Sequence, residues 1–227
     1  FEHGVGYWSP ATGAQFVGEP VLSAWGAYGY QTGSMGYPRS GGVVGVGGSR
    51  HQIFEGGIAY WRPGGRVSFI HGSILNAWAA AGWERSWLGL PTSNETASTK
   101  GGVFQRFERG VAYWSPATGA QFVGEPVLSA WGAYGYQTGS MGYPRSGGVV
   151  GVGGSRHQIF EGGIAYWRPG GRVSFIHGSI LNAWAASGWE HSKVGLPTGR
   201  AVRQADGTMT QTFEKGSISV APNGKVT

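Results

Sequence analysis

The chain has 227 residues, of which 45 are glycine, where ordinary proteins have ~7% glycine. Seventeen Lys and Arg against eleven Asp and Glu give a net charge of +6, and aromatic residues make up 14% of the chain. This composition argues against a disordered chain, the glycine spacing excludes collagen, and the absence of any apolar run of about 18 residues and of cysteine excludes a spanning helix, disulfides and a cysteine metal site.

The sequence is built from a repeat of 53 residues. The pair Phe-Glu recurs at this interval five times, beginning at Phe1, Phe54, Phe107, Phe160 and Phe213. A second level lies on top, because residues 7–80 reappear unchanged as residues 113–186. Two unit types therefore alternate, and a period of this size indicates units that each pack on their neighbours.

The first unit type is expected to contain a hairpin and then a short helix. Pro20 is placed in the first helical turn, where its missing N–H costs nothing. An apolar stripe with helical spacing follows, and Gly29 is expected to end the helix; the stripe consists of Val21, Ala24, Trp25 and Tyr28. The glycine-rich segment 41–48 lacks the dinucleotide-binding fingerprint and is expected to be a flexible loop.

The second unit type predicts the same order of elements more clearly. A two-residue hairpin turn at Gly56-Gly57 joins two strands, and equivalent turns end in Gly4, Gly110 and Gly216, as a positive φ would require. Pro63-Gly64-Gly65 makes a second turn, and residues 67–70 form a third strand. A helix then opens at Gly72-Ser73 and ends at Gly82; its apolar stripe is Ile74, Ala77, Trp78 and Ala81.

These elements predict a β-rich fold with short helices (α+β) that forms one repeat domain over residues 1–227. The units start at residues 1, 54, 107 and 160, and a partial fifth unit covers 213–227. Five hairpins are joined by four connectors, which favours a five-fold pseudosymmetric, propeller-like toroid of 53-residue repeats. An open solenoid of four and a fraction units is the alternative.

Two aromatic side chains and a carboxylate recur in every complete unit. The glutamate of each Phe-Glu pair is expected to accept backbone N–H groups near the hairpin turn, with a sugar-hydroxyl acceptor as the alternative. Because neighbouring side chains on a strand point to opposite faces, one member of each Tyr-Trp pair is expected to face outward, where it either stacks on a sugar ring or packs between units. The candidate ligand-binding residues are Tyr7, Trp8, Tyr60, Trp61, Arg62, Tyr113, Trp114, Tyr166, Trp167 and Arg168.

The sequence offers no catalytic or metal-binding constellation. No histidine has a partner at zinc spacing, and no serine lies in a nucleophile elbow. The basic residues are scattered, so no nucleic-acid partner is indicated. We expect no cofactor, no metal and no nucleic acid, and we expect the helix tryptophans at 25, 78, 131 and 184 to be buried.

Each unit also carries a Gly-x-Pro tetrapeptide 34 residues after its Phe-Glu phenylalanine. The four copies are Met35-Gly36-Tyr37-Pro38, Leu88-Gly89-Leu90-Pro91, Met141-Gly142-Tyr143-Pro144 and Val194-Gly195-Leu196-Pro197. Together with the Phe-Glu-x-Gly and Tyr-Trp motifs in register, they resemble the LGFP repeat of secreted and envelope proteins of actinobacteria. The third position is Tyr or Leu where the family motif has Phe.

The resemblance implies a non-catalytic, secreted module at the cell wall or cell surface. Such repeats look like modules appended to cell-wall hydrolases or mycoloyltransferases, and by resemblance the partner would be an envelope polysaccharide, arabinogalactan or peptidoglycan. An appended enzyme domain in the parent protein is a possible further partner. The alternatives are a free-standing lectin-like toroid that binds several glycans and, with less support, a glycan hydrolase.

Overall fold

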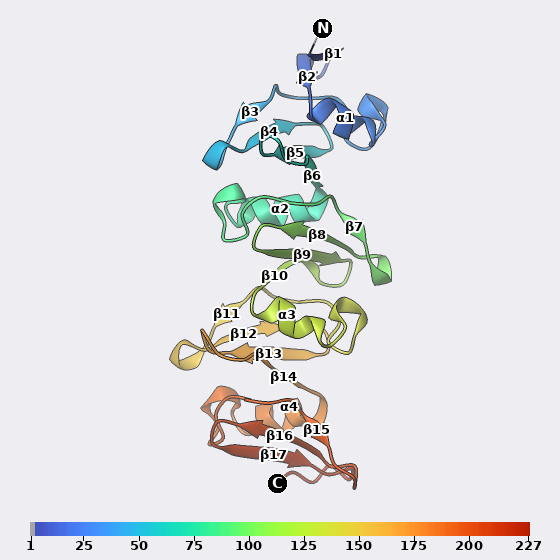
Figure 1. Cartoon of the computed structure of the whole chain (residues 1–227). Coiled ribbons are helices and arrows are strands. Elements are labelled where there is room, and N and C mark those ends of the chain that lie inside the picture. The colour runs from blue at the N-terminus through green and yellow to red at the C-terminus, as the bar shows by residue number, and fades with distance from the viewer. Residues whose placement is uncertain (1–2) are drawn as a thin grey trace. The chain divides into compact units, whose positions relative to one another are not determined.

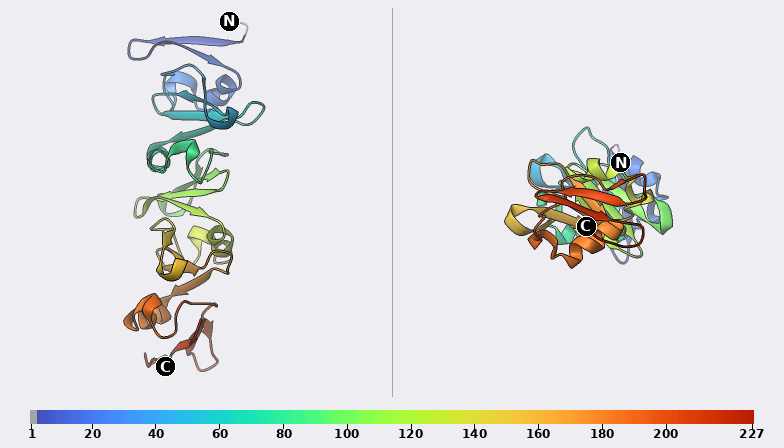
Figure 2. Two further views of the ribbon diagram at one scale, coloured as in Figure 1. Left: turned by 90° about the vertical axis from the view of Figure 1, so that its left-hand side faces the viewer. Right: turned by 90° about the horizontal axis from the view of Figure 1, so that it is seen from below.

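The computed structural model describes residues 3–227, so the first Phe-Glu pair lies outside the described residues. The described chain is β-rich, with few helices and several small antiparallel sheets (Figure 1). Two further views show the strands as separate short sheets (Figure 2). The chain divides into two compact units, Phe1–Ala120 and Gln121–Thr227. The expectation of a β-rich fold with short helices is confirmed.

The first unit contains one two-stranded hairpin, two further sheets and two α-helices. The hairpin is β1-β2, the next sheet has the strand order β3-β4-β5-β6, and the third has the order β10-β9-β8-β7. Its helices are α1 (Val21–Gly26), α2 (Gly72–Ala80) and the 3-10 turns η1 (Tyr30–Thr32), η2 (Val46–Gly48), η3 (Trp83–Arg85) and η4 (Thr99–Gly101). Its strands are β1 (Gly4–Ser9), β2 (Gly13–Gly18), β3 (Val43–Val44), β4 (Arg50–Ile53), β5 (Gly57–Trp61), β6 (Ser68–His71), β7 (Thr96–Ala97), β8 (Val103–Phe107) and β9 (Gly110–Ser115), and β10 (Gly119–Gly124) runs on into the second unit.

The second unit repeats this order. One sheet has the order β11-β12-β13-β14, and the last has the order β15-β16-β17. Its helices are α3 (Val127–Gly132), α4 (Gly178–Ala186) and the 3-10 turns η5 (Tyr136–Thr138), η6 (Val152–Gly154) and η7 (Trp189–His191). Its strands are β11 (Val149–Val150), β12 (Arg156–Ile159), β13 (Gly163–Trp167), β14 (Ser174–His177), β15 (Val202–Arg203), β16 (Met209–Phe213) and β17 (Gly216–Val220).

The hairpin turns lie one residue earlier than the sequence predicted. Phe107 pairs with Gly110, so Glu108 and Arg109 are the two central turn residues. Gly57 is not in the left-handed region, so the expected positive φ is wrong there. Glycine is needed at that position for a different reason, because a Cβ on Gly57 would lie 2.5 Å from the carbonyl oxygen of Ile70 on the neighbouring strand.

The helices follow the prediction closely. α2 begins at Gly72, its stripe residues Ile74 and Trp78 are buried, and Gly82 lies beyond its end with a φ of 103°. Gly29 plays the same part after α1 with a φ of 82°. Pro20 is the residue that precedes α1, one position earlier than predicted.

The glycine-rich segment 41–48 is not the loop without secondary structure that we expected. Val43 and Val44 form β3, which pairs with His51 and Arg50 at the edge of the sheet. Residues 46–48 then form the 3-10 turn η2. The matching segments supply β7, β11 and β15, so each of the three later sheets also gains a short edge strand from this part of the repeat.

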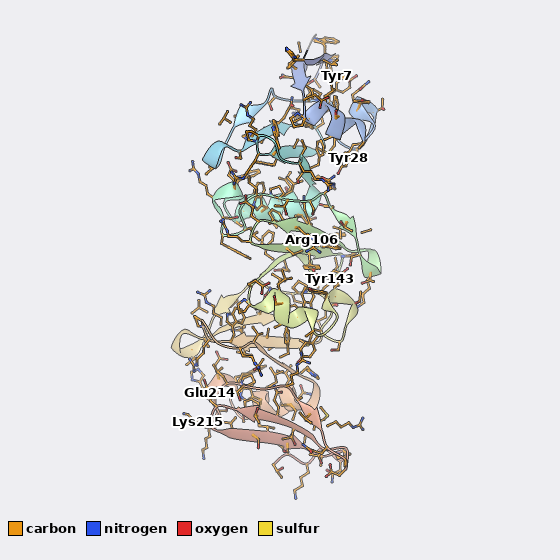
Figure 3. The ribbon with its side chains drawn as sticks, in the orientation of Figure 1. Tyr7, Tyr28, Arg106, Tyr143, Glu214 and Lys215 are labelled. Carbon is orange, nitrogen blue, oxygen red and sulfur yellow. The ribbon has the colours of Figure 1, made fainter. Side chains whose placement is uncertain are left out.

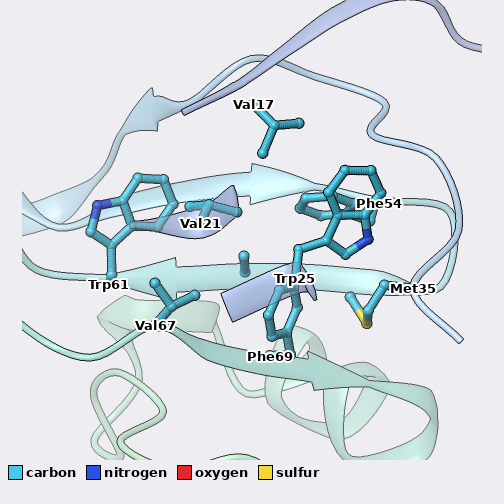
Figure 4. Close-up of a cluster of buried hydrophobic side chains, with 9 residues drawn as sticks. Val17, Val21, Trp25, Met35, Phe54, Trp61, Val67 and Phe69 are labelled. Carbon is cyan, nitrogen blue, oxygen red and sulfur yellow. The ribbon is translucent and has the colours of Figure 1, made fainter. Parts of the chain in front are cut away.

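The helix tryptophans are the centres of the core, as predicted. All four are fully buried, at 0% exposed: Trp25, Trp78, Trp131 and Trp184. Around Trp25 the cluster contains Val17 from β2, Met35 from the tetrapeptide and Phe54 from the next hairpin (Figure 4). The ring centroids of Trp25 and Phe54 are 5.1 Å apart. One residue from each motif of the repeat therefore meets in one cluster.

A buried glutamine connects each sheet to the strand that precedes it. The Nε2 atom of Gln105 donates to the carbonyl oxygens of Phe69, at 2.9 Å, and Ser93, at 2.8 Å. Gln52 makes the same pair of hydrogen bonds to Phe16 and Ser40. We call these residues the glutamine clamps; the four are Gln52, Gln105, Gln158 and Gln211.

Candidate functional site

The tetrapeptide is held by the hairpin turn that follows it, 18 residues further along the chain. The Glu108 Oε2 atom accepts the N–H of Leu90 at 3.2 Å, and the indole N–H of Trp78 donates to the Gly89 carbonyl at 3.1 Å. Gly36 has a φ of 64°, and a Cβ there would lie 2.5 Å from the Glu55 carboxylate. The motif is therefore a signature of the fold, and the expectation that the Phe-Glu glutamates accept backbone N–H groups is confirmed for the four described ones, Glu55, Glu108, Glu161 and Glu214.

Beside this contact lies a cavity that we call the first groove. It has a volume of 180 Å³ and lies between the end of β5, the turn after it and the tetrapeptide. Its lining includes two of the candidate residues, the rim of Trp61 and the side chain of Arg62, together with Pro91, Thr92 and Glu108. The aromatic rim, the proline ring and the charged pair give the groove one apolar and one polar wall.

The second unit contains a matching cavity, the second groove, with a volume of 190 Å³. Each residue that lines the first groove has its counterpart 106 residues later in the lining of the second. Trp167 and Arg168 take the places of Trp61 and Arg62, and Glu214 takes the place of Glu108. Glu214 lies beside Lys215 at the turn between β16 and β17 (Figure 3). The site thus occurs once in each unit.

An ion pair sets the polar wall of each groove. The Nη2 atom of Arg62 lies 2.9 Å from Glu108 Oε1, and its Nη1 donates to the Gly47 carbonyl at 2.9 Å. Arg168 and Glu214 are likewise 2.9 Å apart. The arginine side chains are 48% exposed, so each guanidinium is fixed in direction and still reaches water.

The pKa values of both glutamates are lowered. Partial burial raises the pKa of Glu108, but the hydrogen bonds from Arg62 and from the Leu90 N–H, with the charges of Arg62 and Arg109, outweigh it. For Glu214 the hydrogen bond from Arg168 is the largest cause. Each groove therefore presents an ionised carboxylate at neutral pH, which is a hydrogen-bond acceptor only.

The expectation of one outward member in each Tyr-Trp pair is wrong at two of the four pairs. Tyr60 and Tyr166 are each 3% exposed, while Trp61 is 8% and Trp167 9% exposed. Both faces of β5 are covered. Tyr60 packs edge-on against Trp78 with ring centroids 5.0 Å apart, while Trp61 joins the cluster around Trp25. Trp61 lines the first groove, and Tyr166 and Trp167 line the second.

The other two pairs, in the first unit, differ from these and from each other. Trp8 is 66% exposed, and Tyr7 is half-buried with its ring edge-on to Trp25. Tyr113 is buried, and Trp114 is half-buried in a separate cavity of 160 Å³ that also contains His71 and Glu95. A serine follows each of these pairs in place of the arginine, so neither can form the charged wall.

No metal site is found in the part of the chain that the structure describes. Residues 3–227 contain no cluster of three or more His, Asp or Glu side chains that could hold an ion. None of the helices in the same range has the length and hydropathy needed to cross a bilayer.

Fold and grooves define a tandem-repeat protein with recurring aromatic sites. A family model described as the LGFP repeat matches residues 1–33, 35–86, 88–139 and 141–192, so the chain belongs to the LGFP repeat family and the resemblance is confirmed. A comparison with curated proteins found no match.

Two solved structures show only distant similarity to the chain. A streptogramin B lyase is 10% identical with a TM-score of 0.18, over 99% of this chain and 61% of that one. The extracellular domain of a hybrid two-component system from B. thetaiotaomicron is 12% identical with a TM-score of 0.19, over 80% of this chain and 21% of that one. The chain spans less than two thirds of either structure, and TM-scores of this size do not establish a shared fold.

Proposed function

We propose that the chain is a non-catalytic module that binds a glycan of the cell envelope, with arabinogalactan or peptidoglycan as the polysaccharide. The observation that carries the proposal is the pair of equivalent grooves, each with a tryptophan rim, a fixed guanidinium and an ionised carboxylate. Apolar rims contact the C–H faces of sugars, and charged donors and acceptors bind hydroxyl groups. Family membership supports the polysaccharide partner and a secreted place at the wall or cell surface.

The grooves support binding better than glycan hydrolysis. The lining of the first groove includes one carboxylate, Glu108, whereas hydrolysis commonly uses two at a set separation. A general acid also needs a raised pKa, and the pKa of Glu108 is lowered. Each groove is small, so we expect a Kd of about 1 mM, or about −4 kcal/mol, with retention coming from several sites on one polymer.

The test is retention on insoluble arabinogalactan and peptidoglycan after both grooves are filled. Replacing Trp61 and Trp167 would disturb the core, so we choose the exposed rim residues Thr92→Lys and Thr198→Lys. The control with equal charge is Ala11→Lys with Ala117→Lys, at exposed turn positions outside the grooves. The proposal expects retention to fall only in the groove variant; equal retention of both variants would contradict it.

We also propose that the four complete 53-residue repeats and the partial fifth repeat close into the five-fold pseudosymmetric ring that the repeat count favours. The support is the sequence observation of five hairpins joined by four connectors. Small-angle X-ray scattering tests it, because a compact chain of this length has a radius of gyration of about 17 Å. A markedly larger radius would contradict the ring and favour the open solenoid.

A further inference from the structure

The second unit contains a larger cavity beside its groove, which we call the arginine cavity. Its volume is 360 Å³, within the range of sites that hold a small ligand. It lies between the end of α3, the start of β14 and the segment after the last tetrapeptide; the residues that matter here are Tyr134, Arg172, Ser174, Phe175 and Arg200. Arg172 also lines the second groove, so the two spaces adjoin.

Two arginine side chains line this cavity, beside two aromatic rings that pack on each other. The guanidinium carbon of Arg200 lies 4.7 Å from the centroid of the Tyr134 ring, a cation–π contact that fixes its direction. The Tyr134 ring in turn packs on Phe175 with centroids 4.7 Å apart. Arg172 and Arg200 are both exposed, so their donors reach a ligand from solvent.

Buried polar groups in the lining point to a ligand. Ser174 is 2% exposed, and its Oγ has no hydrogen-bond partner among residues 3–227. The carbonyl oxygen of Phe175 accepts Gln211 Nε2 at 3.0 Å, so the N–H and carbonyl of this strand residue face away from β13. The lining thus supplies a hydroxyl and a backbone N–H as well as two guanidinium groups.

In the first unit the chain itself supplies one partner at the same place, although the Oγ of Ser68, the counterpart of Ser174, also has no hydrogen-bond partner among residues 3–227. There Asn94 replaces Arg200, and its Oδ1 accepts the N–H of Phe69 at 2.9 Å. Glu95 replaces Ala201; burial and then the Glu95 charge raise the pKa of the Tyr28 hydroxyl, and the Arg66 charge lowers it. A guanidinium has no acceptor atom, so Arg200 cannot do for Phe175 what Asn94 does for Phe69.

The formal charge of the side chains at these matching positions therefore differs: it is balanced in the first unit and positive in the second. The first unit has Arg66, Asn94 and Glu95 at these positions, whereas the second has Arg172, Arg200 and Ala201. In the first unit the Glu95 carboxylate lies 3.8 Å from the Nδ1 atom of His71. In the second unit that carboxylate is missing and a second arginine is added.

We propose that the arginine cavity binds a carboxylate carried on a sugar ring, a uronic-acid-type residue of the polysaccharide that lies in the second groove. Arg172 and Arg200 donate to the carboxylate, and the Phe175 N–H and the Ser174 hydroxyl are the buried donors beside it. The rest of the polysaccharide extends into the second groove, which shares Arg172 with the cavity. This inference deepens the proposed function, because it assigns acidic sugars to the second unit and not to the first.

The experiment exchanges Arg200 and Ala201 with their counterparts in the first unit, Asn94 and Glu95. Arg200→Asn with Ala201→Glu gives the second unit the first unit's residues, and Asn94→Arg with Glu95→Ala does the reverse. Both variants use residues that this fold already holds at the matching place, and equal thermal midpoints verify folding. The probes are sodium glucuronate, methyl glucoside as the neutral counterpart, and inorganic phosphate. Each probe is titrated into the protein, and its binding is measured from the amide resonances in NMR spectra.

We expect glucuronate to shift the Phe175 amide resonance of the unchanged protein and to bind at least 10-fold more weakly to Arg200→Asn/Ala201→Glu. The reverse variant should gain a second site, seen at the Phe69 amide. Equal binding of glucuronate to the unchanged protein and the first variant would overturn the proposal, as would phosphate or methyl glucoside binding as well as glucuronate does.

A separate arm distinguishes this inference from the proposed function. Retention on a neutral polysaccharide should fall with Thr92→Lys/Thr198→Lys and should not change with Arg200→Asn/Ala201→Glu. If the groove variant has no effect on neutral glycan while glucuronate binding still depends on Arg200, the proposed function fails and the carboxylate site stands. Loss of neutral glycan binding in the Arg200 variant would overturn the carboxylate assignment.

Discussion

Trp25 and Trp78 occupy the same place in successive helices but differ in one hydrogen bond. Both are fully buried. The indole N–H of Trp78 donates to the Gly89 carbonyl at 3.1 Å, whereas the indole N–H of Trp25 has no acceptor within residues 3–227. The two residues lie in one unit and form a natural pair for measuring what this hydrogen bond contributes.

Replacing each of these tryptophans with phenylalanine should separate packing from hydrogen bonding. Both variants lose part of the indole, but only Trp78→Phe leaves the Gly89 carbonyl without its donor. We expect Trp78→Phe to lower the free energy of unfolding by about 1 kcal/mol more than Trp25→Phe. Urea unfolding measures the difference, and equal losses would show that the hydrogen bond has no net effect.

The lowered pKa values of Glu108 and Glu214 predict how stability depends on pH. Because the folded-state pKa is below the ordinary value of about 4.3, the stabilisation is fully present above that value and is lost as the pH falls through the folded-state pKa. Each exposed ion pair should contribute less than about 1 kcal/mol. We expect Glu108→Gln/Glu214→Gln to flatten the fall in thermal midpoint between about pH 5 and pH 3; an unchanged slope would contradict this.

At the residue scale, the sequence predicted the environment of a side chain where a local pattern alone determines it. The helical spacing identified Trp78 as core, and its side chain is fully buried. The spacing could not show that Trp61 is covered, since strand alternation says which face a side chain points to and not what lies against that face. The pairing of Arg62 with Glu108, 46 residues apart, needs the packing of one 53-residue repeat on the next within the first unit.

At the scale of the elements, the glutamine clamps are buried hydrogen bonds that join a strand to segments earlier in the chain. Gln105 is fully buried, and both of its hydrogen bonds reach carbonyl oxygens outside its own strand. A polar residue two positions before each phenylalanine of the Phe-Glu pairs is a signal that the sequence carries at Gln52, Gln105, Gln158 and Gln211. This signal does not predict a clamp from the sequence alone, because a buried glutamine on a strand cannot be told from an exposed one without knowing the partner element.

Removing one clamp should destabilise the first unit strongly. Gln105→Met keeps a long side chain but leaves the carbonyls of Phe69 and Ser93 without a donor. We expect a loss of about 2–4 kcal/mol in the free energy of unfolding, since each orphaned buried acceptor costs about 1–3 kcal/mol. Arg106→Ala, at the exposed neighbouring position, is the control and should cost about 0.5 kcal/mol. Similar losses in both variants would remove the clamp's special role.

The elements that could not be predicted from the sequence are those whose position depends on the pairing of strands. β3 has two residues, Val43 and Val44, too few for any alternation to be seen, and it forms because the edge of β4 is open to it. The hairpin turn was misplaced by one residue because composition indicates a glycine turn, while register decides that Phe107 pairs with Gly110. Helix ends at Gly29 and Gly82 were predictable, because a left-handed residue there is a local requirement.

At the scale of the whole molecule, duplication of 106 residues has given two grooves of the same chemistry and one unmatched arginine cavity. The grooves share matching lining residues, whereas the cavity lining has Gly199 and Arg200 where the first unit has Ser93 and Asn94. Groove contacts use apolar rims and hydrogen bonds and should depend only modestly on salt. The arginine cavity relies on charge and should lose affinity as salt is added.

Two equal grooves on one chain predict that binding to a long polysaccharide depends on both. A polymer held in one groove raises the effective concentration of its next segment at the other, so avidity exceeds the affinity of one site without any new contact. Thr92→Lys alone should therefore weaken binding to the long polysaccharide at least about 10-fold, while a short oligosaccharide binds the remaining groove with its affinity unchanged. Thr198→Lys alone should do the same, and Ala11→Lys should do neither. Surface-immobilised polymer and soluble oligosaccharide, compared on the same variants, measure the two affinities. If each single variant loses only half of the bound amount and none of the affinity, the grooves act independently and the chain is no multivalent binder.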